Sequence, residues 1–479
     1  MTAPDPPDAD PAPSTGRNMV AARALARVYA GLRDLVHLDL AEQRRMLVHL
    51  AKWTALGTVV GLLSGSAVAL FLATLDWATR TRLTHPWLLW LLPVAGLVIG
   101  VAYLRLGGRA GGGNNLILDE IHEPTAWVPR RMALMIYVGT VVSVLFGASV
   151  GREGTALQMS GSITDLFSRA VHLDPADRRI MLISALAGGF GAVFGVPVAG
   201  CVFALEIQSV GRMRYDALVP ALTASLVGDL VVRHFGVLKG AYPTLGPVTL
   251  NAELVGKVAV AGVAFGLVAL LFAELMHGVR RVFESTPLWP PLRPFVGGLL
   301  VIALTYLVGS RAYLGLSVPL IGQSFADGIG VVTFAFALKL LFTSLSLGSG
   351  FPGGEVTPLF VIGATLGVTM GRLLGVPIEL MAAIGFVAVF AGAANVPITC
   401  TVMGAELFGS HAIVLFAVAC VVSYVCSAHR GIYSSQRIGV AKGAVLLGPS
   451  TGPEASLHAF GQHRPRWLPG PRGEPPEQS

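Results

Sequence analysis

The chain has 479 residues, of which 53% are hydrophobic and only 13% charged, and its mean hydropathy is +0.68. Soluble domains carry about 25% charged residues, so this composition excludes an ordinary soluble domain and predicts a protein that crosses the bilayer several times. The net charge is +7. In a membrane protein such an excess belongs to cytoplasmic loops. Because the basic residues lack the aromatic interleaving of a nucleic-acid surface, no nucleic-acid partner is expected.

Two polar segments precede the first apolar stretch. Residues 1–18 are rich in Pro and Asp, which predicts a disordered tail and is the opposite of an apolar signal core. Residues 19–47 mix Ala, Leu and Arg at near-helical spacing, which predicts a cytoplasmic amphipathic helix on the membrane surface. A solvated helix of a small soluble cap fits the same pattern equally well.

Apolar segments separated by polar or Gly-rich breaks fill the chain from residue 48 to about 440. The first two are expected at roughly 48–75 and 87–105, joined by the polar loop TRTRLTH, and residues 107–115 cannot form a regular helix. Further segments are expected at roughly 132–150, 155–168, 180–208, 216–234, 255–277, 296–309, 331–346, 356–374, 379–394 and 396–427. Several are shorter than the roughly 20 residues that span a bilayer, which predicts half-helices. Residues 441–479 form a short polar, Pro/Gly-rich tail, too short for a folded regulatory domain.

An internal repeat is the most informative feature of the chain. Three pairs of identical residues recur at offsets of 200 to 202: Pro197 and Pro397, Glu206 and Glu406, and Glu153 and Glu355. These matches predict duplicated halves at about 48–236 and 255–440. Transporter folds often contain such repeats, and their substrate sites lie where broken helices from the two halves meet.

Three Gly-rich breaks, at residues 111–115, 151–155 and 348–358, each precede an apolar segment. Each therefore offers a helix N-terminus inside the membrane, where free N–H groups and the helix dipole attract an anion. Side-chain donors that would supplement these groups are Asn114, Asn115, Thr155 and Thr357. We expect the breaks to converge on one anion site suited to a small, strongly hydrated anion.

Glu153 lies between glycines and between apolar segments, and an ionisable residue in such a place is a functional candidate. Ionised, it would compete with the anion for N–H groups; protonated, it would withdraw and carry a proton. Burial and N–H donors shift its pKa in opposite directions, so both charge states stay open. An ion pair with Arg152 is the alternative, disfavoured because adjacent helical residues do not face each other. Glu355 could serve the site or only cap its helix.

The remaining polar and sulfur-containing residues give no sign of a metal, a cofactor or catalysis. Glu206 and Glu406 are expected to be structural, bonded to backbone or partners. The four cysteines lie in apolar segments without a CxxC pair, and no histidine has HxxxH or HExxH spacing. Residues 147–151 match GxSxG by letter, but that motif requires a strand-to-helix turn. We therefore expect no metal, no cofactor and no enzyme.

Over roughly residues 45–440 the chain resembles the CLC family of chloride channels and anion/proton antiporters. GREGT at 151–155 is similar to the family motif G-(K/R)-E-G-P, and GFPGGEVTP at 350–358 is similar to its G-x-F-x-P region. HRGIYSSQ at 429–436 resembles the segment with the family's anion-coordinating tyrosine, which matches Tyr433. The resemblance implies an all-α polytopic membrane protein with two inverted-topology repeats and broken, re-entrant helices. It also implies a homodimer of the cytoplasmic membrane with Glu153 as the gating glutamate.

The departures from the family pattern resemble its fluoride-exporting branch. Thr155 replaces a proline, EVT at 355–357 replaces I-F-A, and Ile207 stands where many antiporters have an inner proton-transfer glutamate. Residues 111–116 fall where chloride transporters have G-S-G-I-P, with glycine or asparagine in place of the central serine, and the branch's first-loop methionine has no counterpart. This likeness implies exchange of cytoplasmic fluoride for protons; a chloride/proton antiporter or a voltage-gated-type chloride channel is the alternative. The site residues it implies are Glu153 as gate and proton carrier, with Gly113, Asn114, Asn115, Gly151, Arg152, Gly154, Thr155, Glu355, Val356, Thr357 and Tyr433 around the anion.

Overall fold

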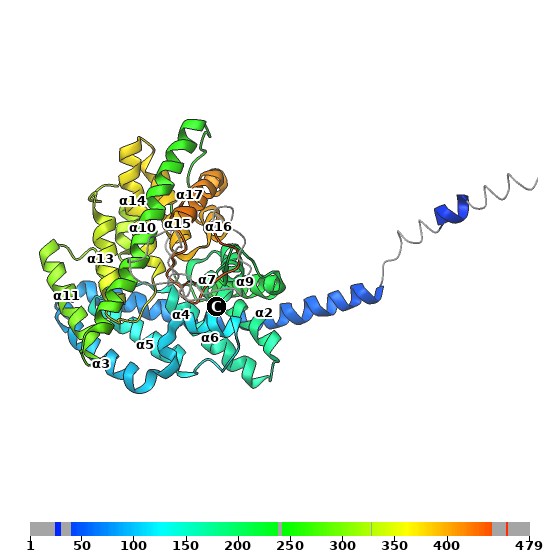
Figure 1. Cartoon of the computed structure of the whole chain (residues 1–479), viewed down its shortest axis with the longest axis horizontal. Coiled ribbons are helices and arrows are strands. Elements are labelled where there is room, and N and C mark those ends of the chain that lie inside the picture. Colours follow the sequence, from blue (N-terminus) through cyan, green and yellow to red (C-terminus); the bar gives the residue numbers. More distant parts are fainter. Residues whose placement is uncertain (1–23, 30–39, 238–241, 327, 443–456, 458–479) are drawn as a thin grey trace, which may run out of the picture. The chain divides into compact units, whose positions relative to one another are not determined.

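The computed structural model describes residues 24–29, 40–237, 242–326, 328–442 and 457 (Figure 1). The chain divides into two units, Met1–Trp53 and Thr54–Ser479. The described ranges are helical apart from loops and two short parallel strands, β1 (Ser209–Val210) and β2 (Arg437–Ile438). The predicted tail at 1–18 and most of the tail at 441–479 lie outside the described residues.

The first long helix, α2 (Leu40–Thr84), differs from the prediction at both ends. Its first turns include residues 40–47, so no break separates a surface helix from the span expected at 48–75. Its last turns include TRTRLT, which was expected to be a loop. The polar groups of this end are satisfied within the helix: Arg80 pairs with Asp76 at 2.8 Å, one turn away, and the Thr79 hydroxyl donates to the Leu75 carbonyl at 2.8 Å.

Irregular helical turns follow α2 and lead to the first half-helix. In chain order the elements of the first half are η1 (Pro86–Leu91), α3 (Leu92–Ala102), the π-helical η2 (Tyr103–Gly107), the 3-10 helix η3 (Gly108–Gly112), α4 (Gly113–His122), α5 (Arg131–Phe146), α6 (Glu153–Ala170), α7 (Pro175–Phe194), α8 (Pro197–Glu206), η4 (Tyr215–Ala217) and α9 (Leu218–His234). The predicted irregularity at 107–115 is confirmed up to Gly113, where α4 begins, and Gly108 and Gly113 have positive φ.

The second half is again built mainly from short helices. Its elements are α10 (Ala252–Ser285), α11 (Leu292–Val308), α12 (Val318–Phe325), α13 (Ala335–Gly348), α14 (Val356–Leu374), α15 (Ile378–Ala394), α16 (Pro397–Phe408), η5 (Ser410–Ala412) and α17 (Ile413–Cys426). Helix α12 was not predicted, because its eight residues give too short a pattern. Five stretches of the described chain are long and apolar enough to cross a membrane, and several other apolar helices have only 10–17 residues, which confirms the predicted half-helices.

Two expected single segments, 180–208 and 396–427, are each two helices. Pro197 divides the first by opening α8, and Pro397 likewise opens α16, because proline fits the first turn of a helix and cannot continue the helix before it. The second segment divides after α16 at Gly409, which has a φ of 91°. The helices just before these prolines, α7 and α15, lie almost wholly in the core. Small residues let them approach their neighbours: a Cβ atom on Gly385 of α15 would collide with the carbonyl oxygen of Gly363 of α14.

The two halves cap each other's helices through a reciprocal pair of glutamates. Glu206, at the end of α8, accepts hydrogen bonds from the backbone N–H of Ile398 at 3.1 Å and of Thr399 at 2.8 Å, and from the Thr399 hydroxyl at 2.6 Å. Glu406, on α16, accepts from the backbone N–H groups of Val198 at 3.0 Å and Ala199 at 2.8 Å, at the start of α8. Each carboxylate thus satisfies N–H groups that the other helix cannot satisfy itself. The expected structural role of both glutamates is confirmed.

We expect Glu206→Ala to destabilise the fold more than Glu406→Ala. Glu206 is only 7% exposed, whereas Glu406 is exposed. Losing Glu206 leaves buried donors without an acceptor, at a cost of about 1–3 kcal/mol each, while losing an exposed cap costs about 1 kcal/mol. Thermal unfolding of the purified variants in one detergent measures the difference. Equal losses of stability in the two variants would contradict this reading of the caps.

Candidate anion-binding site

The Gly-rich breaks of the two halves pair with each other through their backbones. Gly151 N–H donates to the Gly354 carbonyl at 2.6 Å, and Gly354 N–H donates to the Gly151 carbonyl at 2.9 Å, in an antiparallel bridge. A Cβ atom on Gly151 would lie 2.8 Å from the Gly354 oxygen, so only glycine allows this approach. Since α6 begins at Glu153 and α14 at Val356, the bridge brings both helix N-termini to one junction.

The third break reaches the same junction from α4. A Cβ atom on Gly154 would lie 3.0 Å from the Asn114 side-chain nitrogen, 3.0 Å from the Cα atom of Gly354 and 3.4 Å from Oε2 of Glu355. Gly113, the first residue of α4, faces α6, because its Cβ position is 3.6 Å from the Gln158 side-chain nitrogen. The structure therefore brings together the three breaks that the sequence singles out, and with them three helix N-termini.

Glu153 is fully buried, and its carboxylate lies against the N-terminus of the helix from the other half. Oε2 accepts from the backbone N–H of Thr357 at 2.9 Å and of Arg152 at 3.2 Å, and Oε1 accepts from the Thr357 hydroxyl. Thr357 is the second residue of α14, whose first N–H groups have no acceptor within the helix. The carboxylate thus occupies the position at which a helix N-terminus attracts an anion.

The ion pair between Arg152 and Glu153, which sequence reasoning disfavoured, is present, but the distance between its charged atoms is long. Arg152 Nε lies 3.7 Å from Glu153 Oε1. The rule about adjacent helical residues does not apply, because Arg152 has a φ of −117° and precedes the first helical residue. At 3.7 Å the pair lacks the short contact of a charge-assisted hydrogen bond, so Thr357 holds the carboxylate more closely than Arg152 does.

Four polar atoms near this junction are buried without a hydrogen-bond partner among the described residues. They are Oε2 of Glu355, Oδ1 of Asn114, Nε of Arg152 and the hydroxyl of Tyr433. Buried polar atoms are almost always satisfied, so a group of exceptions at one place points to a functional site. The Tyr433 hydroxyl also interacts electrostatically with both Glu355 and Glu153, which links it to the same site.

The segment that holds Tyr433 is fixed by contacts with the first half of the chain. The backbone N–H of Ser435 donates to Oδ1 of Asn115 at 3.1 Å, and the Gln436 side chain donates to the carbonyl of Ile207 at 2.9 Å. Beyond it, β2 pairs with β1, and Arg437 donates to Glu123 at 2.5 Å. That hydrogen bond holds the pKa of the exposed Glu123 carboxyl below its usual value. These hydrogen bonds of the neighbouring residues hold Tyr433 in position.

Two residues expected to donate to the anion also contact other segments of the chain. The Thr155 hydroxyl lies 2.7 Å from the hydroxyl of Thr140 on α5, and the Asn115 side-chain oxygen is occupied by the 431–436 segment. Val356 is buried at the first position of α14 and contributes its backbone to the site. All three residues lie near the junction, and the contacts of Thr155 and Asn115 support its framework.

Sequence reasoning missed a buried lysine behind the site. Lys339 on α13 is fully buried and has no carboxylate partner among the described residues. Its ammonium donates to the Ser149 hydroxyl at 2.8 Å, the Ser317 hydroxyl at 2.9 Å, and the carbonyls of Gly315 at 2.8 Å and Tyr313 at 3.2 Å. Ser149 belongs to the loop that leads to Glu153. A lone lysine in an apolar segment was the signal that could have identified it.

The fold and the junction define a polytopic membrane transport protein built from two halves with broken helices. Residues 95–428 match the profile of the family described as voltage gated chloride channel, and the chain belongs to this CLC family. A chloride/fluoride channel protein of Pseudomonas syringae pv. tomato is 49% identical over 407 residues, covering 84% of this chain and 90% of the relative. Membership places the chain among channels and antiporters rather than enzymes.

Solved structures confirm the CLC-type all-helical fold. The crystal structure of a CLC-type fluoride/proton antiporter aligns with a TM-score of 0.78 and 32% identity, covering 81% of this chain and 98% of that chain. A slow cyanobacterial Cl⁻/H⁺ antiporter aligns with a TM-score of 0.68 and 20% identity, covering 78% of this chain and 94% of that chain. The second likeness supports the fold alone.

Proposed function

We propose that this protein exports fluoride from the cytoplasm in exchange for protons, with Glu153 as gate and proton carrier. The observation that carries the proposal is the buried Glu153 carboxylate bound to Thr357 at the N-terminus of α14. The similarity to a CLC-type fluoride/proton antiporter and to a chloride/fluoride channel protein supports the choice of ion. No cofactor is required, because binding, competition and proton transfer use groups of the chain itself.

The ionised form of Glu153 closes the site. Its two oxygens take the N–H and hydroxyl donors of Thr357 and the N–H of Arg152. An anion arriving at the same helix N-terminus needs these donors and is repelled by the carboxylate at close range. Anion and carboxylate therefore exclude each other.

Protonation of Glu153 opens the site. The neutral acid is a weaker acceptor, because charge-assisted hydrogen bonds are roughly twice as strong as neutral ones. The anion then takes the Thr357 donors and the N-terminal N–H groups of α6, while the acid moves away with its proton. Return of the ionised side chain displaces the anion, so each cycle moves a proton and an anion in opposite directions.

The polar surroundings favour fluoride over chloride. A small anion loses strong hydration when it enters, and only closely spaced hydrogen-bonding groups replace it. Backbone pairing at Gly151 and Gly354 draws the helix N-termini close together. Glu355 adds a buried oxygen without a partner, which accepts a proton beside the anion. In this proposal Asn114 and Tyr433 complete the polar shell.

The same proposal includes the oligomeric state, the membrane and the domain bounds of the protein. It acts as a homodimer in the cytoplasmic membrane, with residues 48–440 as the transport domain and repeats at about 48–236 and 255–440. The segment 19–47 lies on the cytoplasmic side in this arrangement. Cross-linking of the protein in native membranes tests the dimer separately from transport.

Flux measurements test the choice of ion. Protein in liposomes loaded with both anions is expected to release fluoride at least about 10-fold faster than chloride, a factor that requires only about 1.4 kcal/mol. A pH electrode should record proton entry into the liposomes together with fluoride release. Equal chloride release would favour the chloride/proton antiporter, and fluoride release without proton movement would favour a channel.

A further inference from the structure

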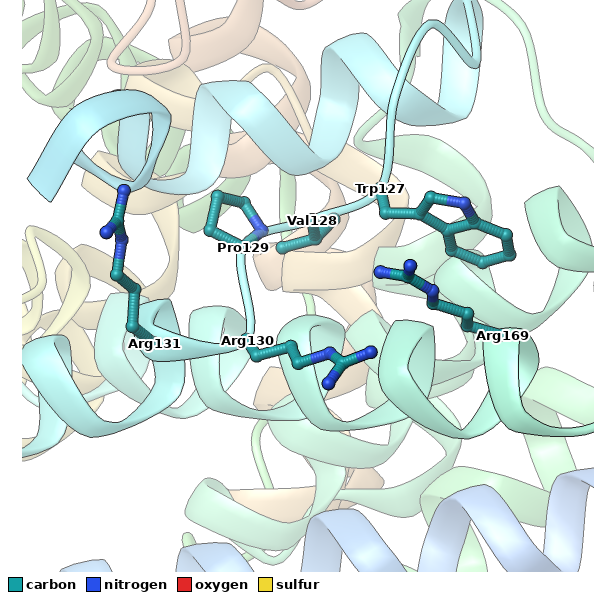
Figure 2. Close-up of a pocket in the computed structure, with 6 residues that line it drawn as sticks. All are labelled: Trp127, Val128, Pro129, Arg130, Arg131 and Arg169. Carbon is teal, nitrogen blue, oxygen red and sulfur yellow. The ribbon is translucent and has the colours of Figure 1, made fainter.

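A cationic pocket lies between the loop that joins α4 to α5 and the C-terminal end of α6 (Figure 2). It has a volume of about 390 Å³ and is lined by Trp127, Val128, Pro129, Arg130, Arg131 and Arg169. Half of these residues are arginines, and none is acidic. Figure 2 shows Arg169 extending beneath Trp127 and Arg130 extending toward it, whereas the Arg131 side chain points away from both on the other side of Pro129.

The side chains of the three arginines of this pocket have no hydrogen-bond or ion-pair partner within the described part of the chain, and that of Arg169 lies 5.8 Å from the Trp127 ring centre. The acidic residues nearby are engaged elsewhere. Asp165 accepts from Arg178 at 2.6 Å, and Glu120 accepts from Arg109 at 2.5 Å. The pocket therefore has a positive charge that no carboxylate of the described chain balances.

Trp127 is held in place by this buried ionic network. The backbone N–H of Val128 donates to Asp165 at 2.7 Å, and Arg178 donates to the Ala126 carbonyl at 3.0 Å. In addition to its ion pairs, the Arg178 guanidinium lies 4.6 Å from the Trp127 ring centre. The wall of the pocket is thus pre-formed, which lowers the ordering cost of binding.

Exposed apolar side chains extend from the arginines along the same helix faces. Leu134 and Val138 follow Arg131 by three and seven residues on α5, and they are 65% and 47% exposed. Leu166 precedes Arg169 by three residues on α6 and is 41% exposed. Residues at this spacing share a helix face. A tryptophan with arginines beside an apolar face is typical of a membrane–water boundary.

We propose that this pocket binds the headgroup of an anionic phospholipid, with the phosphate at Arg130 and Arg169 and an acyl chain along Leu134 and Leu166. Arginine suits the phosphate, because its planar donors match phosphate oxygens in pairs. A soluble anion would use the arginines alone, whereas an amphiphile uses both the charge and the apolar face. The excess of arginine places the pocket at the cytoplasmic leaflet.

Retention of lipid by the purified protein tests the proposal. Protein in mixed micelles of phosphatidylglycerol and phosphatidylcholine is delipidated stepwise, and bound lipids are counted by native mass spectrometry. The variant Arg130→Gln/Arg169→Gln is expected to hold roughly 10-fold less phosphatidylglycerol than the wild type. Its phosphatidylcholine content should not change. Arg280→Gln/Arg281→Gln removes the same charge from exposed residues of α10, outside the segment predicted to lie on the membrane surface, and is the matched control.

Each other outcome identifies a different role for the pocket. Equal loss of phosphatidylglycerol in both double variants would show general attraction to net charge and overturn the site. Displacement of the lipid by millimolar inorganic phosphate would show a site for soluble anions instead. A fall of fluoride release from pure phosphatidylcholine liposomes in the double variant would assign the arginines to the transport path. The variant Arg130→Lys/Arg169→Lys keeps the charge but loses the paired donors, so it should hold an amount of phosphatidylglycerol between those of the wild type and the glutamine variant. A content as low as that of the glutamine variant, with an unchanged unfolding temperature, would show that the paired donors and not the charge hold the lipid.

Discussion

Glu153→Gln is expected to reduce fluoride-driven proton uptake by about 100-fold or more, since a positioned proton-transfer group contributes about that factor. The amide cannot take up or release a proton, so the exchange cycle loses its proton carrier. It also lacks the negative charge that displaces an anion from the N-terminus of α14. Simultaneous recording of internal pH and fluoride release in liposomes measures both effects.

Glu253→Gln is the matched control for this experiment. Glu253 is exposed, lies in the first turn of α10, and pairs only with Lys257 at 2.7 Å among the contacts that the structure gives it. The same chemical change there should leave proton coupling at the wild-type level. Proton uptake that continues at the normal rate in Glu153→Gln would remove Glu153 from the role of proton carrier.

Much of the site could be predicted from the sequence because its main features, the breaks and starts of helices, are set by residues close together in the chain. Glycine-rich stretches mark the breaks before α4, α6 and α14, and Pro397 marks the start of α16. The start of α8 at Pro197 was missed, because 180–208 was expected as one segment. The repeat offset then pairs Glu153 with Glu355 and predicts that both halves contribute. The bridge between Gly151 and Gly354 is the contact through which they meet.

The missed features depend on partners distant in the chain. The sequence shows that Glu206 lies in an apolar run, but not that Thr399 provides its donors. It shows a threonine at 155, but not that the hydroxyl of this residue is hydrogen-bonded to the hydroxyl of Thr140. The polar end of α2 was read as a loop because composition alone does not reveal which Thr and Arg side chains satisfy groups of their own helix.

Lys339 is the clearest example of a residue whose role only the structure reveals. A charged group inside a membrane protein must be satisfied at close range, because water is absent. Four acceptors do this here, from the loop before Glu153 and from residues 313–317. The lysine therefore joins the first half of the chain to the second behind the anion site, independently of the Gly151 bridge.

Lys339→Met is expected to destabilise the protein by roughly 2–6 kcal/mol, since two buried carbonyls lose a donor at about 1–3 kcal/mol each. Ser149 keeps its contact with Thr343 at 2.9 Å, so the loop before Glu153 loosens without losing every anchor. Thermal unfolding in detergent measures the effect. Lys257→Met is the control, because Lys257 pairs with an exposed glutamate one turn away and such pairs contribute at most about 1 kcal/mol. If both variants unfold at the wild-type temperature, the ammonium does not hold the halves together, and its hydrogen bonds contribute no more than those of a surface lysine.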